Sequence, residues 1–128
     1  MARPKANQIT ERELEVMQVF WDQGAQTAAE AQSALAERKS RELAYTTVAT
    51  LIKILVDKGF LKQTNDKRPF TYAPIRSFKD VSSTLVGDLI NRVFGGSREQ
   101  LLIRMLEQKK LSKKERQLLE DILKEKKS

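Results

Sequence analysis

The sequence contains neither cysteine nor histidine. The chain therefore has no thiol nucleophile, no imidazole base, no disulfide and few of the usual side-chain ligands of transition metals. It also lacks a run of about 18 apolar residues, the length that a membrane-spanning helix needs. Its first residues are not followed by the apolar core of a signal peptide. We therefore expect a cytoplasmic protein that is not an enzyme, holds no cofactor or metal, and does not insert into a membrane.

Glycine and proline are also scarce, with five and three residues, while charged residues make up 32% and hydrophobic residues 40% of the chain. This composition is typical of a helix-rich globular protein. The 128 residues allow one compact domain, or a small domain with an appendage that needs a partner to bury its apolar face. The net charge of +7 favours an anionic partner, although the basic residues are spread over both halves of the chain.

Five serines or threonines are each followed, three positions later, by Glu, Asp or Gln, which is the spacing of a capping box at the start of a helix. The pairs are Thr10 with Glu13, Thr27 with Glu30, Ser77 with Asp80, Ser97 with Gln100, and Ser112 with Glu115. Glycines at 24, 59 and 95–96 are typical helix ends. We therefore predict three helices before residue 60, of which the third covers roughly 45–58, and three helices after residue 76.

The first and third predicted helices each carry an apolar stripe at helical spacing, which predicts a shared core. After Gly59 the periodicity becomes that of strands, so residues 60–64 and 70–73 are predicted to pair as a hairpin with a basic, turn-rich tip at 65–69. The expected core stripes are Leu14, Met17, Phe20 and Trp21 in the first helix, and Val48, Leu51, Ile52, Leu55 and Val56 in the third.

A helix pair, a third helix and a basic hairpin make up a winged helix-turn-helix, in which the third helix enters the major groove of DNA. We expect a mainly α (α+β) fold, with a winged helix-turn-helix DNA-binding domain over residues 1–76 and a three-helix dimerisation region over 77–128. The tail carries more apolar surface than three helices can hide alone, and burial by a partner gains about 25 cal/mol per Å². The expected dimerisation residues are Leu85, Leu89, Leu101, Leu102, Leu118, Leu119 and Ile122.

The outer face of the third helix carries threonines, whose hydroxyls can bond to either kind of base edge and whose methyls can touch the thymine methyl. Basic residues, Arg38 among them, lie on both sides of this helix, where phosphates would be. The same threonines could instead be ordinary helix-start residues, and the lysines could be solvated surface residues. The candidate DNA-binding residues are Thr46, Thr47, Thr50, Lys53, Arg41, Lys62, Lys67 and Arg68.

Several stretches resemble the penicillinase repressor family of winged-helix transcriptional regulators (BlaI/MecI/CopY type). They are Ile9–Met17, Ala44–Val48, Lys58–Leu61 and Phe70–Pro74. The resemblance implies a dimeric repressor of inducible resistance-type genes such as β-lactamase, with one winged domain on each half of a palindromic DNA operator. It places base contacts on Thr46, Thr47 and Thr50, and phosphate contacts on Lys67 and Arg68. Several members have Arg or Lys where this chain has Ala49, so the base preference does not carry over.

Two departures from that family concern regulation. The copper-responsive branch senses metal through cysteines, which this chain lacks. In the β-lactam-responsive branch, a membrane metalloprotease sensor leads to cleavage between Asn and Phe in the fifth helix, and the matching pair here is Arg104 and Met105. These two residues are the candidate cleavage site, with such a sensor as the candidate partner.

Two other interpretations belong to different functional classes. The winged fold could serve as a protein–protein interaction module with no DNA target. A small enzyme would need a polar pocket, and the sequence offers no convergent carboxylates and no nucleophile from which to build one.

Overall fold

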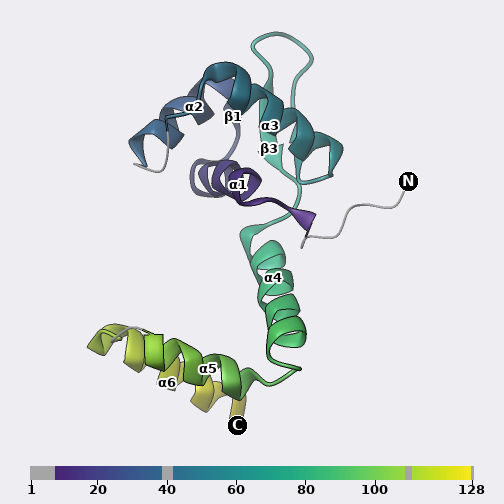
Figure 1. The fold of residues 1–128 in the computed structure, drawn as a ribbon. Coiled ribbons are helices and arrows are strands. Elements are labelled where there is room, and N and C mark those ends of the chain that lie inside the picture. The colour runs from purple at the N-terminus through teal and green to yellow at the C-terminus, as the bar shows by residue number, and fades with distance from the viewer. Residues whose placement is uncertain (1–7, 39–41, 109–110, 128) are drawn as a thin grey trace. The chain divides into compact units, whose positions relative to one another are not determined.

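The computed structural model describes residues 8–38, 42–108 and 111–127, with side chains as far as residue 121. The chain forms two compact units, Met1–Val86 and Gly87–Ser128. The first contains α1 (Glu11–Gln23), β1 (Gln26–Thr27), α2 (Ala28–Glu37), α3 (Tyr45–Asp57), β2 (Leu61–Gln63) and β3 (Thr71–Pro74) (Figure 1). The helix α4 (Phe78–Val93) belongs to both units, and the second also contains α5 (Arg98–Gln108) and α6 (Lys113–Lys127). These helices and the small sheet confirm the predicted mainly α (α+β) fold.

The boundary between these two units lies inside α4, between Val86 and Gly87, later in the chain than the domain boundary predicted at residues 76 and 77. The first half of α4 belongs to the first unit because its Val81 is fully buried in that unit's core. Leu85, one turn later, packs against the same core. The assignment of DNA binding and dimerisation to the two parts of the chain remains a prediction.

The helix starts follow the predicted capping residues, but only three of the five pairs are reciprocal. Thr10 with Glu13, Thr27 with Glu30, and Ser112 with Glu115 form both bonds of the capping box. At the other two starts the serine accepts from the backbone N–H three residues on. The Asp80 carboxylate, however, bonds to Arg76, and the Ser97 amide donates to the Phe94 carbonyl. The prediction of five complete boxes was therefore wrong at Ser77 and Ser97.

The predicted hairpin is present, and it pairs with a strand that the sequence did not predict. Strand β3 lies in the middle of a three-stranded antiparallel sheet with the order β1-β3-β2. Tyr72 of β3 is opposite Gln26 of β1 on one side and Gln63 of β2 on the other. The loop between β2 and β3 projects from the body of the unit (Figure 1). We call β2, the loop 64–70 and β3 the wing.

The core of the first unit is formed by α1, α2, α3, β2 and the start of α4. Val48, Ile52 and Leu55 of α3 are fully or almost fully buried, as predicted, whereas Leu51 and Val56 of the same stripe are half-buried at its edges. Since α3 buries only this stripe, the opposite side of the helix is left at the surface.

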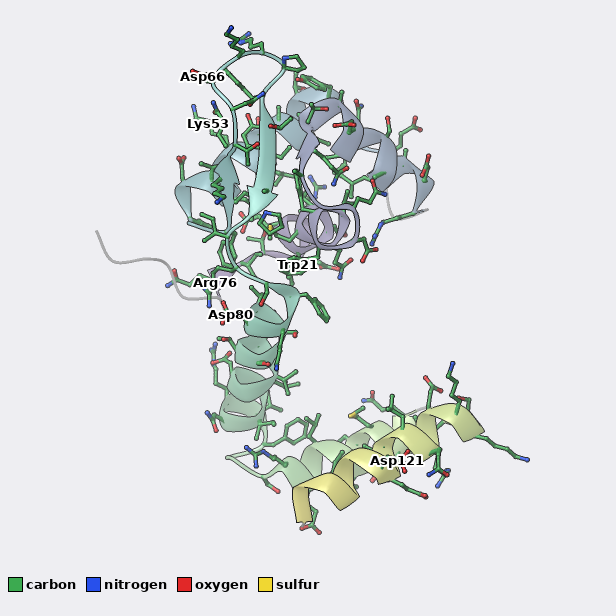
Figure 2. All side chains as sticks on the ribbon, turned by 180° about the vertical axis from the view of Figure 1, so that it is seen from behind. Trp21, Lys53, Asp66, Arg76, Asp80 and Asp121 are labelled. Carbon is green, nitrogen blue, oxygen red and sulfur yellow. The ribbon has the colours of Figure 1, made fainter. Side chains whose placement is uncertain are left out.

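Trp21 was predicted to be buried in the core, but it is only half-buried and lies at the edge of the core. Its indole N–H donates to the Arg76 carbonyl at 2.9 Å. Its ring meets Phe78 edge to face, with 5.3 Å between the ring centroids. Arg76 in turn bonds through Nε to Asp80 at 2.7 Å, which lowers the pKa of that carboxyl (Figure 2). Trp21 therefore holds the start of α4 on the first unit.

The second unit has no buried side chain among residues 87–108 and 111–121. Leu101, Leu102 and Ile103 of α5 are only half-buried. The more exposed large apolar side chains in this part are Leu89, Val93, Met105, Leu106 and Leu118, with exposed fractions of 40%, 65%, 46%, 45% and 59%. Within these described residues, the helices therefore present apolar surface without a buried core.

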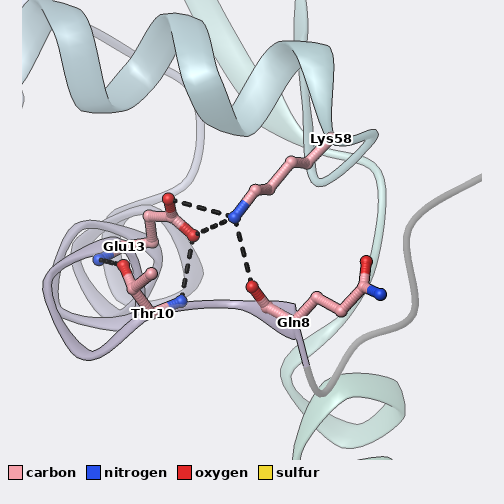
Figure 3. Close-up of polar contacts among 4 residues, drawn as sticks. All are labelled: Gln8, Thr10, Glu13 and Lys58. Atoms are coloured by element: carbon pink, nitrogen blue, oxygen red, sulfur yellow. Dashed lines mark hydrogen bonds and ion pairs between the residues drawn. The ribbon is translucent and has the colours of Figure 1, made fainter.

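One buried ion pair joins the start of α1 to the end of α3. The Glu13 side chain is only 5% exposed, and it accepts from the Lys58 ammonium at 2.9 and 3.2 Å (Figure 3). The same carboxylate accepts from the Thr10 amide at 2.9 Å, so it is also part of the α1 cap. Lys58 donates further to the Gln8 carbonyl at 3.1 Å. The ion pair therefore fixes where α3 ends relative to the start of α1.

Burial alone would raise the pKa of Glu13, but the hydrogen bonds from Lys58 and Thr10, together with the Lys58 charge, lower it below its ordinary value of 4.5. A carboxyl whose pKa is lower in the folded state stabilises the fold above its unfolded-state pKa. This contribution is present at neutral pH and is lost as the pH falls below about 4.5 through the lower folded-state pKa.

We predict that Lys58→Met lowers the free energy of unfolding by about 1–3 kcal/mol at pH 7, because it leaves the Glu13 carboxylate buried without its cation. The difference from the native chain should shrink as the pH falls and the Glu13 carboxylate becomes protonated. Urea unfolding at several pH values measures both effects. Lys53→Met, at an exposed position of the same helix, is the control and should change the stability by less than about 0.5 kcal/mol. A loss that is equal at pH 7 and pH 3 would contradict this role of the ion pair.

Candidate nucleic-acid interface

The outer side of α3 carries three of the four candidate residues that the sequence placed on this helix. Thr46, Thr50 and Lys53 are exposed, and they follow one another at helical spacing on the side opposite the buried stripe. Thr47 is half-buried at the edge of this side. We call the exposed surface of Thr46, Thr50 and Lys53 the outer face of α3.

The hydroxyl of Thr50 donates to the Thr46 carbonyl one turn earlier, at 2.8 Å. Its proton is therefore used within the helix, as is common for threonine in helices. What Thr50 offers to a ligand is its methyl group and the lone pairs of its oxygen. These groups suit a thymine methyl or a base amino group, which are found in the major groove.

The wing supplies the positive charge beside this face. Lys62 on β2 is exposed, as are Lys67 and Arg68 in the loop. The Arg68 guanidinium lies over the Phe70 ring, 5.5 Å from its centroid, a cation–π contact that restricts the side chain. The candidate Arg41 lies outside the described residues.

An open pocket lies between the wing and the first turns of α2 and α3. Its volume is about 250 Å³, and it is lined by Thr27, Ala28, Ala29, Tyr45, Arg68, Pro69, Phe70 and Tyr72. Tyr45, the first residue of α3, is 52% exposed and presents a phenol hydroxyl next to this surface. The sequence predicted no role for Tyr45, although its position directly before Thr46 and Thr47 could have indicated one.

Not every basic residue near α3 is available for an anion. Arg38, which the sequence placed beside this helix, forms an ion pair with Asp22 at the end of α1.

Two acidic residues also lie close to the candidate surface, because Asp57 is the last residue of α3 and Asp66 is in the wing loop. Figure 2 shows Lys53 and Asp66 towards one end of the first unit and Trp21, Arg76 and Asp80 towards the other. The candidate interface is thus formed by α3 and the wing.

The expected dimerisation residues lie on α4, α5 and α6. Leu89 and Leu118 are exposed, whereas Leu101, Leu102 and Leu119 are half-buried. Leu85 packs on the core of the first unit, and the Ile122 side chain lies outside the described part. The candidate cleavage pair is within α5, where Arg104 bonds to Glu107 at 2.9 Å and Met105 is 46% exposed.

Two further findings concern the described part of the chain only. None of its helices is both long and apolar enough to cross a bilayer. Within the same residues, no three acidic side chains gather closely enough to hold a metal ion.

Comparison with known proteins gives consistent matches over most of the chain. The sequence profile described as penicillinase repressor matches residues 9–125. The penicillinase repressor of Bacillus licheniformis is 30% identical over 97% of this chain and 95% of its own length. The transcriptional regulator BlaI of Mycobacterium tuberculosis is 32% identical over 80% of this chain and 75% of its own. The solution structure of the DNA binding domain of the repressor BlaI is 30% identical, with a TM-score of 0.50, over 59% of this chain and 90% of that domain.

The structural match supports the description of the N-terminal part as a winged helix, which the element order and the sheet had indicated. The profile match extends from the residue before the α1 cap to the last turns of α6. The resemblance that the sequence motifs suggested is therefore confirmed, and the chain belongs to the penicillinase repressor family.

Proposed function

We propose that this chain is a DNA-binding transcriptional repressor that acts as a homodimer on a palindromic operator. The observation that carries the proposal is the joint exposure of Thr46, Thr50 and Lys53 on α3 beside the basic wing, in a member of the penicillinase repressor family. The resistance-type genes that the family resemblance implied are the proposed targets. Its named relatives are a penicillinase repressor and a transcriptional regulator. We therefore propose that this chain is also a regulator and not an enzyme.

Within each winged domain, the outer face of α3 and the wing are proposed to contact different parts of the DNA, because their side chains differ in chemistry. The threonines of α3 offer hydroxyl oxygens and methyls, which suit base edges in the major groove. Lys62, Lys67 and Arg68 offer charge, which suits phosphates and carries no base preference. Because the α3 face has no Arg, Asn or Gln for a bidentate base contact, we expect modest discrimination at each base pair.

Dimerisation is proposed from the apolar surface of the second unit. Described side chains such as Leu89, Val93 and Leu118 are exposed, and none within 87–108 and 111–121 is buried. A second copy would cover this surface and would set the spacing of two α3 helices along a duplex. Because a transcriptional repressor acts where the DNA is, the proposed location is the bacterial cytoplasm.

Regulation by a membrane metalloprotease sensor remains a proposal. The Arg104–Met105 pair lies inside the α5 helix, so cleavage there would need that helix to open locally. Its residues also differ from the Asn–Phe pair that the family resemblance implied. An adjacent gene for such a sensor would support control by cleavage.

We predict that selection from a random DNA pool recovers an inverted repeat. The logarithm of the binding constant should fall linearly with the logarithm of salt concentration, because about six to ten phosphates are neutralised per dimer. Arg68→Ala should reduce the magnitude of this slope by about 1.8, since each phosphate contributes about 0.9 and a dimer carries two copies.

Fluorescence anisotropy at several salt concentrations measures that slope. Lys79→Ala, an exposed lysine of α4 that is outside the candidate interface, is the matched control and should leave it unchanged. If no palindrome is recovered and the native chain shows no salt-dependent retention on DNA, a protein-interaction module becomes the better account.

We also predict that Leu119→Asp yields monomers with weak operator binding, because a carboxylate would be buried in the helical seam. Sedimentation velocity reports the association state, and circular dichroism shows whether the helices persist. Glu120→Asp, at the exposed neighbouring position, should stay dimeric. An unchanged dimer with Leu119→Asp would refute the placement of this residue in the interface.

A further inference from the structure

The loop of the wing has no apolar core. The side chains of residues 62–69 are all exposed, and that of Phe70 is only half-buried. Fixing the backbone of one residue costs about 1–2 kcal/mol in conformational entropy. A loop that buries so little apolar surface must therefore be held by hydrogen bonds if its conformation is to persist.

The side chain of Asn65 makes three of these bonds across the loop. Its Nδ2 donates to the Lys67 carbonyl at 3.1 Å and to the Pro69 carbonyl at 3.2 Å. Its Oδ1 accepts from the Thr71 amide at 2.8 Å. One amide group thus connects the start of the loop to its tip and to the first residue of β3.

Other bonds at the base of the loop support the position of Asn65. The Thr64 amide donates to the Thr71 carbonyl at 2.8 Å and closes the hairpin. The Gln63 side chain donates to the Asn65 carbonyl at 2.6 Å. The backbone of Asn65 is therefore fixed independently of its side chain, which then holds the part of the loop that bears Lys67 and Arg68.

We propose that Asn65 is a positioning residue for DNA binding, a role that rests on the proposed function of the wing. The two Nδ2 hydrogens have two carbonyl acceptors inside the loop, so they are not left to donate to a phosphate. Asn65 acts through Lys67 and Arg68, whose backbone it fixes before DNA arrives. Preorganisation of this kind lowers the entropy that binding must overcome.

The first test uses the DNA-free protein. Asn65→Ala should remove the protection of the Thr71 amide against hydrogen exchange, because Oδ1 is its acceptor. It should also lower the NMR order parameters of residues 64–70, while those of α3 stay unchanged. Gln23→Ala, which truncates an exposed amide side chain at the end of α1, is the control. Unchanged protection and order in Asn65→Ala would overturn the proposal, whether or not the protein binds DNA.

The second test measures binding of the selected operator. Asn65→Ala should weaken it about ten- to a hundredfold, as expected for ordering two wings on binding. The salt slope should stay the same because the phosphate-binding cations remain. In a Lys67→Ala/Arg68→Ala background, the further effect of Asn65→Ala should be less than about twofold, since coupled residues are not additive. A full additional loss in that background, or a reduced slope in Asn65→Ala alone, would overturn the proposal. Absence of any operator binding by the native chain would instead refute the proposed function.

Discussion

The Glu13 carboxylate connects the two helices on which the candidate interface depends. It completes the cap of α1 through the Thr10 amide and receives the ammonium of Lys58 at the end of α3. Together with the buried stripe Val48, Ile52 and Leu55, this contact fixes both the end of α3 and the side that it turns inward. The outer face is exposed as a consequence. The favourable position of a cation at a helix C-terminus adds to the same effect.

The sequence could predict most of the first unit because its signals are local. A threonine three residues before a glutamate satisfies backbone groups at a helix start whatever the rest of the fold does. A stripe at a period of 3.6 residues marks the buried side of α3. The change to alternating residues after Gly59 then marks the wing. For the same reason the exposed positions of Thr46, Thr50 and Lys53 followed from the stripe alone.

Contacts between distant residues were missed because no local pattern reports them. Strand β1 has two residues, too few to show a periodicity, and exists because β3 offers it a partner. Trp21 shared the helical spacing of core residues, yet a carbonyl 55 positions later in the chain accepts its N–H and keeps it at the core edge. The sequence predicted Arg38 as a basic residue beside α3 that could contact phosphates, but in the fold it forms an ion pair with Asp22. The Asn65 bonds likewise depend on the folded loop.

The central claim is that the outer face of α3 and the wing loop contact the operator. The most direct measurement is an NMR titration of threonine-methyl-labelled, 15N-labelled protein with the selected operator duplex. We expect shifts at the methyls of Thr46, Thr47 and Thr50 and at the amides of Lys67 and Arg68, with none at Thr10 or Thr84. Shifts confined to the second unit, with α3 unchanged at saturating DNA, would contradict it.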